Sequence, residues 1–203
     1  RLASIVTGVH AREWKKKIPE IAHKINQQGE SGVGDYLIKR IKNGSSANDI
    51  RSYLKTYELE YGCAADVLIV DYLDIMQPNE GIKNLSVSEQ DKLKAEQLSE
   101  ILHEINAIGI TASQQNRDAI NKSTPDQAGI AGGLSKVNAV DNYISILMTP
   151  EMRIAGQMMI FFLKTRSSDG VGKSHALRFN PSNLIICDTD SSDAPIKPRA
   201  ELL

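Results

Sequence analysis

Hydrophobic residues follow two different spacings along this chain. Residues 67–74, VLIVDYLD, form an apolar run that leads into one acid, Asp71, with a second acid, Asp74, three positions later. A continuous apolar run bounded by polar residues predicts a strand buried on both faces of a parallel sheet. Other segments repeat their apolar residues every three or four positions, as amphipathic helices do. The pattern therefore predicts a mixture of strands and helices.

Two helices are predicted near the start of the chain, over residues 2–9 and 14–28. Pro19 conflicts with an unbroken second helix and implies a kink or a new start there. Basic residues fill the polar face of this second helix, which is typical of a solvated surface. Its apolar face has helical spacing and consists of Trp14, Ile18, Ile21 and Ile25. A glycine-rich loop is expected over residues 27–35.

The middle of the chain predicts a βαβ unit. Residues 36–41 alternate as a strand, residues 45–49 open a helix, and residues 67–74 form the buried strand. The helix is expected to turn four side chains inward: Ile50, Leu54, Tyr57 and Leu59. A crossover between parallel strands is expected to be right-handed.

The clearest helix follows residues 86–89, SVSE, which match a capping box. Its apolar stripe contains Leu98, Ile101, Leu102 and Ile105, and Gly109 is predicted to stop it. Strands are predicted over residues 108–113, 143–148, 158–163, 176–179 and 184–186. Together these elements predict an α/β three-layer domain over residues 1–187 whose late strands form antiparallel hairpins. Residues 188–203 are predicted to form a mobile tail.

Composition narrows the function classes. The 203 residues are 41% hydrophobic and 24% charged, which fits one globular domain with a sizeable core. The net charge of −1 excludes a globally basic nucleic-acid binder, so contacts to nucleic acid must come from local loops. Cys63 and Cys187 match no metal-ligand spacing and are read as free thiols. No apolar run is as long as the roughly 18 residues that a membrane span needs.

Polar side chains follow three successive predicted strands. Asp71 ends the first, Gln114 ends the second, and Lys164 with Arg166 end the third. Ligands bind at the carboxyl ends of the strands in sheets of this class. An acid there can hold hydrated Mg²⁺, an amide can bond a γ-phosphate or attacking water, and cations can neutralise a transferring phosphoryl group. The ordered set predicts phosphoryl-transfer chemistry. A structural reading, with a strand-end salt bridge in place of a site, stays open at this point.

Three segments in this order resemble the carboxyl-terminal ATPase domain of DnaB-type replicative helicases. They are VLIVDYLD, ITASQQNR and FFLKTRSSDGVG, and the resemblance extends over roughly residues 1–188, with residues 130–141 closer to phage-encoded members. It implies a RecA-like three-layer P-loop NTPase core with a central, mainly parallel sheet. It also implies ATP and Mg²⁺ as cofactors, a hexameric homo-oligomer, single-stranded DNA as ligand, a primase or helicase loader as candidate partner, and a cytoplasmic location in a bacterial or phage-infected cell.

The resemblance also implies residue roles. Asp71 would be the Walker B acid that holds Mg²⁺ through water, and Gln114 the sensor amide. Lys164 and Arg166 match a K-x-R pair that acts in trans on ATP bound by the neighbouring subunit, with Arg166 as the arginine finger. The DNA-facing loops would contribute Arg117, Lys122, Gly132, Gly133 and Lys136. Backbone amides and phosphate electrostatics are expected to dominate there, because few aromatic residues are available for stacking.

The family's Walker A loop and catalytic glutamate would lie upstream of Arg1. We therefore expect the chain to be a fragment that lacks the N-terminal part of the domain and does not hydrolyse ATP by itself. Residues 170–174, GVGKS, end like a Walker A motif, but Ser167 stands where its first glycine belongs, so a hairpin turn is predicted instead. Asp74 stands where the bacterial members usually have Gln. Two other hypotheses remain: another RecA-like ATPase such as a recombinase, and a non-catalytic RecA-like module for assembly or DNA binding.

Overall fold

The fold was analysed in a computed structural model, which describes residues 2–30, 34–79, 85–114 and 134–189. The chain divides into two compact units. One contains residues 1–39, 145–161 and 173–203, and the other contains residues 40–144 and 162–172. In the part of the chain that the structure describes, no helix is long and apolar enough to cross a membrane.

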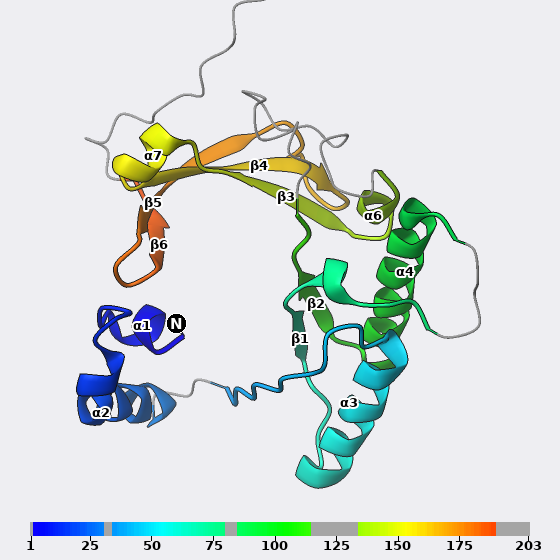
Figure 1. The fold of residues 1–203 in the computed structure, drawn as a ribbon, viewed down its shortest axis with the longest axis horizontal. Helices are drawn as coiled ribbons and strands as arrows, with labels where there is room; N and C mark the ends of the chain where they lie inside the picture. The colour runs from blue at the N-terminus through cyan, green and yellow to red at the C-terminus, as the bar shows by residue number, and fades with distance from the viewer. Residues whose placement is uncertain (1, 31–33, 80–84, 115–133, 190–203) are drawn as a thin grey trace, which may run out of the picture. The chain divides into compact units, whose positions relative to one another are not determined.

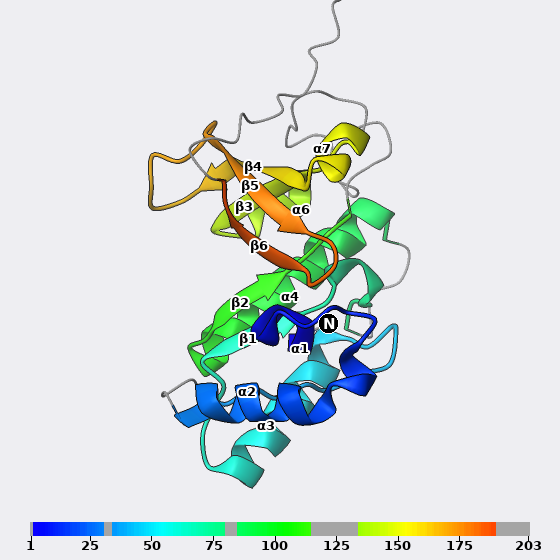
Figure 2. The ribbon, with the colours of Figure 1, turned by 90° about the vertical axis from the view of Figure 1, so that its left-hand side faces the viewer.

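The second unit is built on a parallel pair of strands, β1 (Val67–Val70) and β2 (Ile108–Thr111). The helix α4 (Val87–Ile105) connects them and runs alongside them (Figures 1 and 2). The predicted strands at these two places are confirmed, although both are shorter than expected. Residues after β1 turn into the short 3₁₀ helix η2 (Leu73–Ile75).

Two capping boxes define the starts of the long helices. Ser46 accepts the Asp49 N–H at the start of α3 (Ala47–Tyr61), and Asp49 accepts the Ser46 N–H in return. Ser86 and Glu89 form the same reciprocal pair at the start of α4. Each box satisfies two backbone donors that a helix end leaves without partners. Both predicted helix starts are therefore confirmed.

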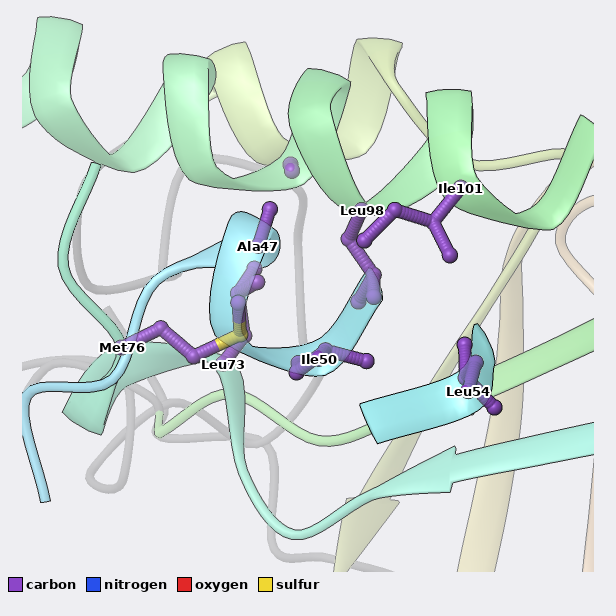
Figure 3. Packing of buried hydrophobic residues seen from close by; sticks show 8 residues of the cluster. Ala47, Ile50, Leu54, Leu73, Met76, Leu98 and Ile101 are labelled. Atoms are coloured by element: carbon purple, nitrogen blue, oxygen red, sulfur yellow. The ribbon is translucent and has the colours of Figure 1, made fainter. Parts of the chain in front are cut away.

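The hydrophobic core of this unit lies between α3, α4 and the segment after β1 (Figure 3). It is formed by Ala47, Ile50 and Leu54 of α3, Leu73 and Met76 after β1, and Ala95, Leu98 and Ile101 of α4. Leu68 and Val70 of β1 pack against this cluster from one face of the strand pair. Because side chains alternate along a strand, the core fixes which face of β1 points inward.

The opposite face of the strand pair is exposed, which corrects the prediction of a strand buried on both sides. Val67 pairs with Ile108 and Ile69 with Ile110, and all four side chains are about half or more exposed. Helices cover parallel sheets on both faces in most α/β proteins. Here the described residues of the unit cover one face only.

Three other expectations are wrong in detail. Residues 36–41 form no strand in the structure, so the predicted first strand of the βαβ unit is absent. Leu59 points to solvent and is 88% exposed, because it lies off the stripe that Ile50 and Leu54 form. Helix α4 ends at Asn106, which adopts a left-handed conformation, and not at Gly109. Gly109 lies inside β2, where a Cβ atom would overlap the side chain of Leu102.

The first unit begins with α1 (Leu2–Thr7), η1 (Trp14–Lys16) and α2 (Ile18–Glu30). The break that Pro19 predicted lies between η1 and α2, with proline in the first turn of α2, where its missing N–H costs nothing. Lys24 of α2 donates a hydrogen bond to the Thr7 carbonyl at 3.1 Å. The N–H of Ala11 bonds the carbonyl of Ser182 at 2.8 Å, in the turn at residues 181–184.

A four-stranded sheet has the order β3-β4-β5-β6. Its strands are β3 (Asn142–Leu147), β4 (Gln157–Thr165), β5 (Ser174–Asn180) and β6 (Ile185–Asp188). The β4–β5 and β5–β6 pairs are antiparallel, which confirms the predicted late hairpins. Short helices precede β3 and β4: α6 (Leu134–Asn138) and α7 (Pro150–Ile154). The proposed tail lies almost entirely outside the described residues.

Candidate functional site

The carboxyl ends of β1 and β2 lie side by side. Val70 and Thr111 are register partners, and the Thr111 hydroxyl donates to the Val70 carbonyl at 2.9 Å. One step further, the Leu73 N–H bonds the Ala112 carbonyl at 3.1 Å. The parallel pairing thus brings the residues after β1 next to the residues after β2, as the sequence predicted for Asp71 and Gln114.

Asp71 is the first residue after β1, and a cis peptide bond joins it to Tyr72. Its side chain is exposed and makes no hydrogen bond or ion pair with any described residue. Mg²⁺ at nucleotide sites keeps several waters and uses one or two carboxylates together with substrate phosphates. An accessible carboxylate that no described side chain contacts fits this role. Among the described residues no group of three or more His, Cys, Asp or Glu could form an all-protein metal cage.

Asp74 connects the two strand ends through hydrogen bonds. Its carboxylate accepts the Gln114 backbone N–H at 2.7 Å and the Ser113 hydroxyl at 3.0 Å, and it pairs with the ammonium of Lys136. Burial raises the pKa of Asp74, but Lys136, the Gln114 N–H and Ser113 together outweigh burial and hold the pKa below its ordinary value. Asp74 is therefore a carboxylate that stays ionised at neutral pH.

A chain of buried charges continues from Asp74 into α4. Lys136 of α6 also contacts Asp91 at 2.9 Å, and Asp91 contacts Lys94 at 2.6 Å. The side chains of Lys136, Asp91 and Lys94 are each less than 10% exposed. Each buried charge thus has an opposite charge beside it, as buried ions require.

Gln114 presents its side-chain amide at the surface beyond β2. The amide donates to the Tyr72 hydroxyl at 3.3 Å, while its backbone N–H is held by Asp74. Tyr72 and Gln114 therefore bridge the two strand ends a second time. An exposed amide fixed at this edge can bond a phosphate oxygen or a water molecule.

Lys164 and Arg166 lie at the end of β4 and have different surroundings. The Lys164 ammonium donates to the Val137 carbonyl at 2.7 Å and to the Asn138 carbonyl at 3.3 Å, at the last turn of α6. Arg166 forms an exposed ion pair with Asp141 at 2.5 Å. Lys164 is thus committed to a helix terminus, while the Arg166 guanidinium lies on the surface.

Of the five predicted DNA-binding residues, the structure describes Lys136. Arg117, Lys122, Gly132 and Gly133 lie outside the described residues. Lys136 was expected to face DNA, but its ammonium is buried between Asp74 and Asp91, and we remove it from the DNA-binding set. The physical reason is that two carboxylates at this position hold the cation inside the unit.

Sequence reasoning missed the buried ion cluster. Asp91 and Lys94 lie seven and four positions before Leu98, so they share the face of α4 that carries the apolar stripe. Charged residues on a core-facing stripe were the signal that could have revealed the cluster. The partners that give these charges their role, Ser113 and Lys136, come from distant segments, which the helical pattern does not show.

The GVGKS segment forms the turn between β4 and β5, which confirms the predicted hairpin. Gly172 has a φ of 82°, and its N–H bonds the Phe162 carbonyl at 2.8 Å. The last residue of the segment, Ser174, begins a strand, β5. A P-loop would open a helix at this point, because the helix N-terminus binds the phosphates.

Known proteins resemble this chain in sequence and in fold. No protein-family model matches the chain. The chain is 27% identical over 160 residues to a DnaB-like replicative helicase of Enterobacteria phage T4, and the match includes 77% of this chain. It spans only about a third of that relative, 32% of its length.

Two solved structures share the fold. One is a DnaB-like replicative helicase that was studied with its interactions with primase; it has a TM-score of 0.73 and 16% identity, over 93% of this chain and 46% of that one. The other is an ATPase domain with a TM-score of 0.71 and 18% identity, over 93% of this chain and 69% of that one. The fold is therefore RecA-like, with a parallel and an antiparallel sheet. The chain is thus similar in sequence to a DnaB-like replicative helicase and shares the fold of these two solved structures.

Proposed function

We propose that this chain belongs to the ATP-driven motor of a replicative DNA helicase, which hydrolyses ATP between subunits and translocates on single-stranded DNA. The observation that carries the proposal is the joined carboxyl ends of β1 and β2. They place an accessible acid, Asp71, and an accessible amide, Gln114, at one sheet edge. Ligands bind at this edge in open α/β sheets.

Asp71 would hold Mg²⁺ through water in this proposal, and Mg²⁺ with ATP would supply the transferable phosphoryl group. The exposed Asp71 carboxylate can accept hydrogen bonds from metal-bound waters without giving up an existing partner. Gln114 would bond the terminal phosphate or the attacking water through its side-chain amide. Its backbone is held by Asp74, so the amide would be oriented before the nucleotide binds.

Arg166 would act on ATP bound by the neighbouring subunit. Its guanidinium is exposed, its partner among the described residues is an exposed carboxylate, Asp141, and such pairs contribute little stability. It can therefore leave this partner for a phosphate at low cost. Lys164 would support it from the same strand end by fixing β4 to the last turn of α6, in addition to the charge it adds near the phosphates.

The remaining parts of the proposal follow from the relationship to DnaB-like helicases. The active form would be a homo-oligomeric ring, and we expect a hexamer. Single-stranded DNA would be bound through Arg117, Lys122 and the backbone of Gly132 and Gly133. Primase or a helicase loader would be the protein partners, and the location would be the cytoplasm.

The test uses the natural gene product that contains these residues, assayed for DNA-stimulated ATP hydrolysis. Asp71→Asn and Arg166→Ala subunits are measured separately and then mixed in equal amounts. Each variant alone should lose turnover by at least about 10³-fold, since every interface lacks one group. Mixing should restore activity, because an Arg166→Ala subunit beside an Asp71→Asn subunit forms a wild-type interface at about a quarter of the positions.

Arg153→Ala provides the control, because Arg153 is an exposed arginine of α7 and is not one of the proposed site residues. It should keep wild-type turnover. If mixing restores no ATP hydrolysis although both variants assemble, the proposal of an active site shared between subunits is wrong. If the wild-type gene product binds DNA without hydrolysing ATP, the non-catalytic alternative replaces this proposal. Strand exchange in place of unwinding would indicate a recombinase.

A further inference from the structure

Three of the most deeply buried charged side chains in the described residues belong to one cluster. Lys136 is 5% exposed, and Asp91 and Lys94 are each 6% exposed. With Asp74 they alternate in sign, from Lys94 to Asp91 to Lys136 to Asp74. Two acids and two bases balance, so the cluster adds no net charge to the interior.

Stability alone explains such a cluster poorly. Taking charges out of water costs several kcal/mol per ion, and well-packed apolar residues of similar volume often serve equally well. Lys94 and Asp91 both belong to α4 and would satisfy one another without a third partner. The second lysine, Lys136 of α6, must therefore contribute through the other groups that it contacts.

Lys136 contacts two groups that Lys94 does not reach. Its ammonium donates to the Ser113 hydroxyl at 3.1 Å and pairs with the Asp74 carboxylate. Both groups belong to the strand ends: Asp74 follows β1, and Ser113 immediately precedes Gln114. Asp74 in turn accepts the backbone N–H of Gln114 at 2.7 Å. A continuous path of contacts thus leads from Lys136 to the backbone of Gln114.

We propose that Lys136 is a positioning residue for Gln114 and acts through the carboxylate of Asp74. The inference rests on the proposed role of Gln114 at the nucleotide site. The Asp74 side chain is 21% exposed, so water competes for its carboxylate. The buried cation keeps the carboxylate turned inward, where it meets the N–H of Gln114. Without the cation the carboxylate turns toward water, and the residues after β2 lose their anchor.

The chain offers a matched pair of variants for the test. Lys136→Met and Lys94→Met each remove a buried ammonium that contacts Asp91, and they replace it with an unbranched apolar side chain. Only the first removes the partner of Asp74. Hydrogen–deuterium exchange of the peptide that contains β2 and Gln114 is measured on the complete gene product without nucleotide. This readout reports the Gln114 N–H and needs no catalytic activity.

We expect Lys136→Met to accelerate exchange in this peptide by on the order of tenfold, the equivalent of one lost hydrogen bond. Lys94→Met should leave the rate within about twofold of the wild type. Equal acceleration in both variants would show that the cluster only stabilises the fold, and an unchanged rate in Lys136→Met would overturn the proposal. Where a methionine variant lacks a native circular-dichroism spectrum, Lys136→Gln and Lys94→Gln replace the pair and are judged by the same outcomes.

A double variant tests whether the path runs through the charge of Asp74. Lys136→Met with Asp74→Asn removes the uncompensated carboxylate but keeps an oxygen that can accept the Gln114 N–H. Exchange should return toward the wild-type rate, and exchange as fast as in Lys136→Met would exclude Asp74 as the intermediary. Gln114→Ala, assayed for ATP hydrolysis, examines the proposed function separately. Full turnover in that variant would reject the sensor role of Gln114 and leave the positional link intact.

Discussion

Lys164 donates its ammonium group to the carbonyl oxygen of Val137 at 2.7 Å and so fixes the end of β4 to the last turn of α6. Arg166, two residues later, pairs with an exposed carboxylate, Asp141, in the part of the chain that the structure describes. Two cations that the sequence presents as a pair therefore differ in what they contribute to the fold. Their variants should separate stability from activity.

Lys164→Met should lower the free energy of unfolding by about 1.5–3 kcal/mol, because two carbonyls at the end of α6 lose their charged hydrogen-bond donor. Arg166→Ala should lower it by less than about 1 kcal/mol, as is usual for an exposed ion pair. Urea unfolding followed by circular dichroism measures both. An equal loss in the two variants would contradict the distinction between the two cations.

Ile101 should be the most sensitive position of the core that Figure 3 shows, because its side chain is fully buried between α4 and its neighbours. Ile101→Ala should cost about 2–5 kcal/mol of unfolding free energy through lost burial and the cavity that remains. Leu59→Ala, at an exposed aliphatic position of α3, should change it by less than about 0.5 kcal/mol. Similar effects at both positions would disagree with the described packing of α3 and α4.

Gly109→Ala should destabilise the protein, since the new Cβ would occupy the position of the Leu102 side chain. Overpacking of this kind costs about 1–3 kcal/mol. Shortening the opposing residue relieves the overlap, so Gly109→Ala combined with Leu102→Ala should be more stable than the sum of the two single effects. A double-mutant cycle in urea measures this coupling. Strict additivity would show that the two residues do not meet.

Asp74 should make stability depend on pH in the acidic range. Its pKa lies below the ordinary value of 3.8 in the folded protein, so the folded state releases this proton more readily than the unfolded chain. The resulting stabilisation is fully present above about pH 5 and is lost as the pH falls through 3.8 toward the folded pKa. Asp74→Asn should therefore flatten the pH dependence of the urea midpoint between about pH 5 and pH 3.

Other carboxylates with lowered pKa values, Asp49, Glu89 and Glu104, keep part of that slope in the variant. The comparison with the wild type isolates the contribution of Asp74. A midpoint that falls with acid as steeply in Asp74→Asn as in the wild type would show that the hydrogen bonds around Asp74 do not favour its ionised form.

Local signals in the sequence predicted local structure well. The capping box at Ser86 was visible because both partners lie within four residues, polar residues marked the helix start at 45–49, and the break before α2 followed from Pro19. The positions of Asp71 and Gln114 could be predicted because parallel strands end at the same edge of a sheet. Each of these rests on short-range spacing or on a general rule of topology.

Long-range pairing was not accessible in the same way. The burial of Lys136 depends on Asp74 and Asp91, which lie 62 and 45 positions away, and no periodic pattern connects them. Residues 36–41 alternate as a strand should, yet a strand also needs a neighbour to receive its hydrogen bonds. Gly109 was predicted to end a helix, but in the structure its lack of a Cβ atom leaves room for the side chain of Leu102.

The half-covered β1–β2 pair has a practical consequence for work with this chain. Its exposed face is an aliphatic surface whose contact with water is unfavourable. It consists of Val67, Ile69, Ile108 and Ile110. Such surfaces adsorb hydrophobic dyes and promote self-association as concentration rises. Preparations of these 203 residues should therefore enhance the fluorescence of anilinonaphthalene sulfonate while remaining folded, and Ile69→Lys with Ile110→Glu should reduce both the dye signal and the loss of material on concentration.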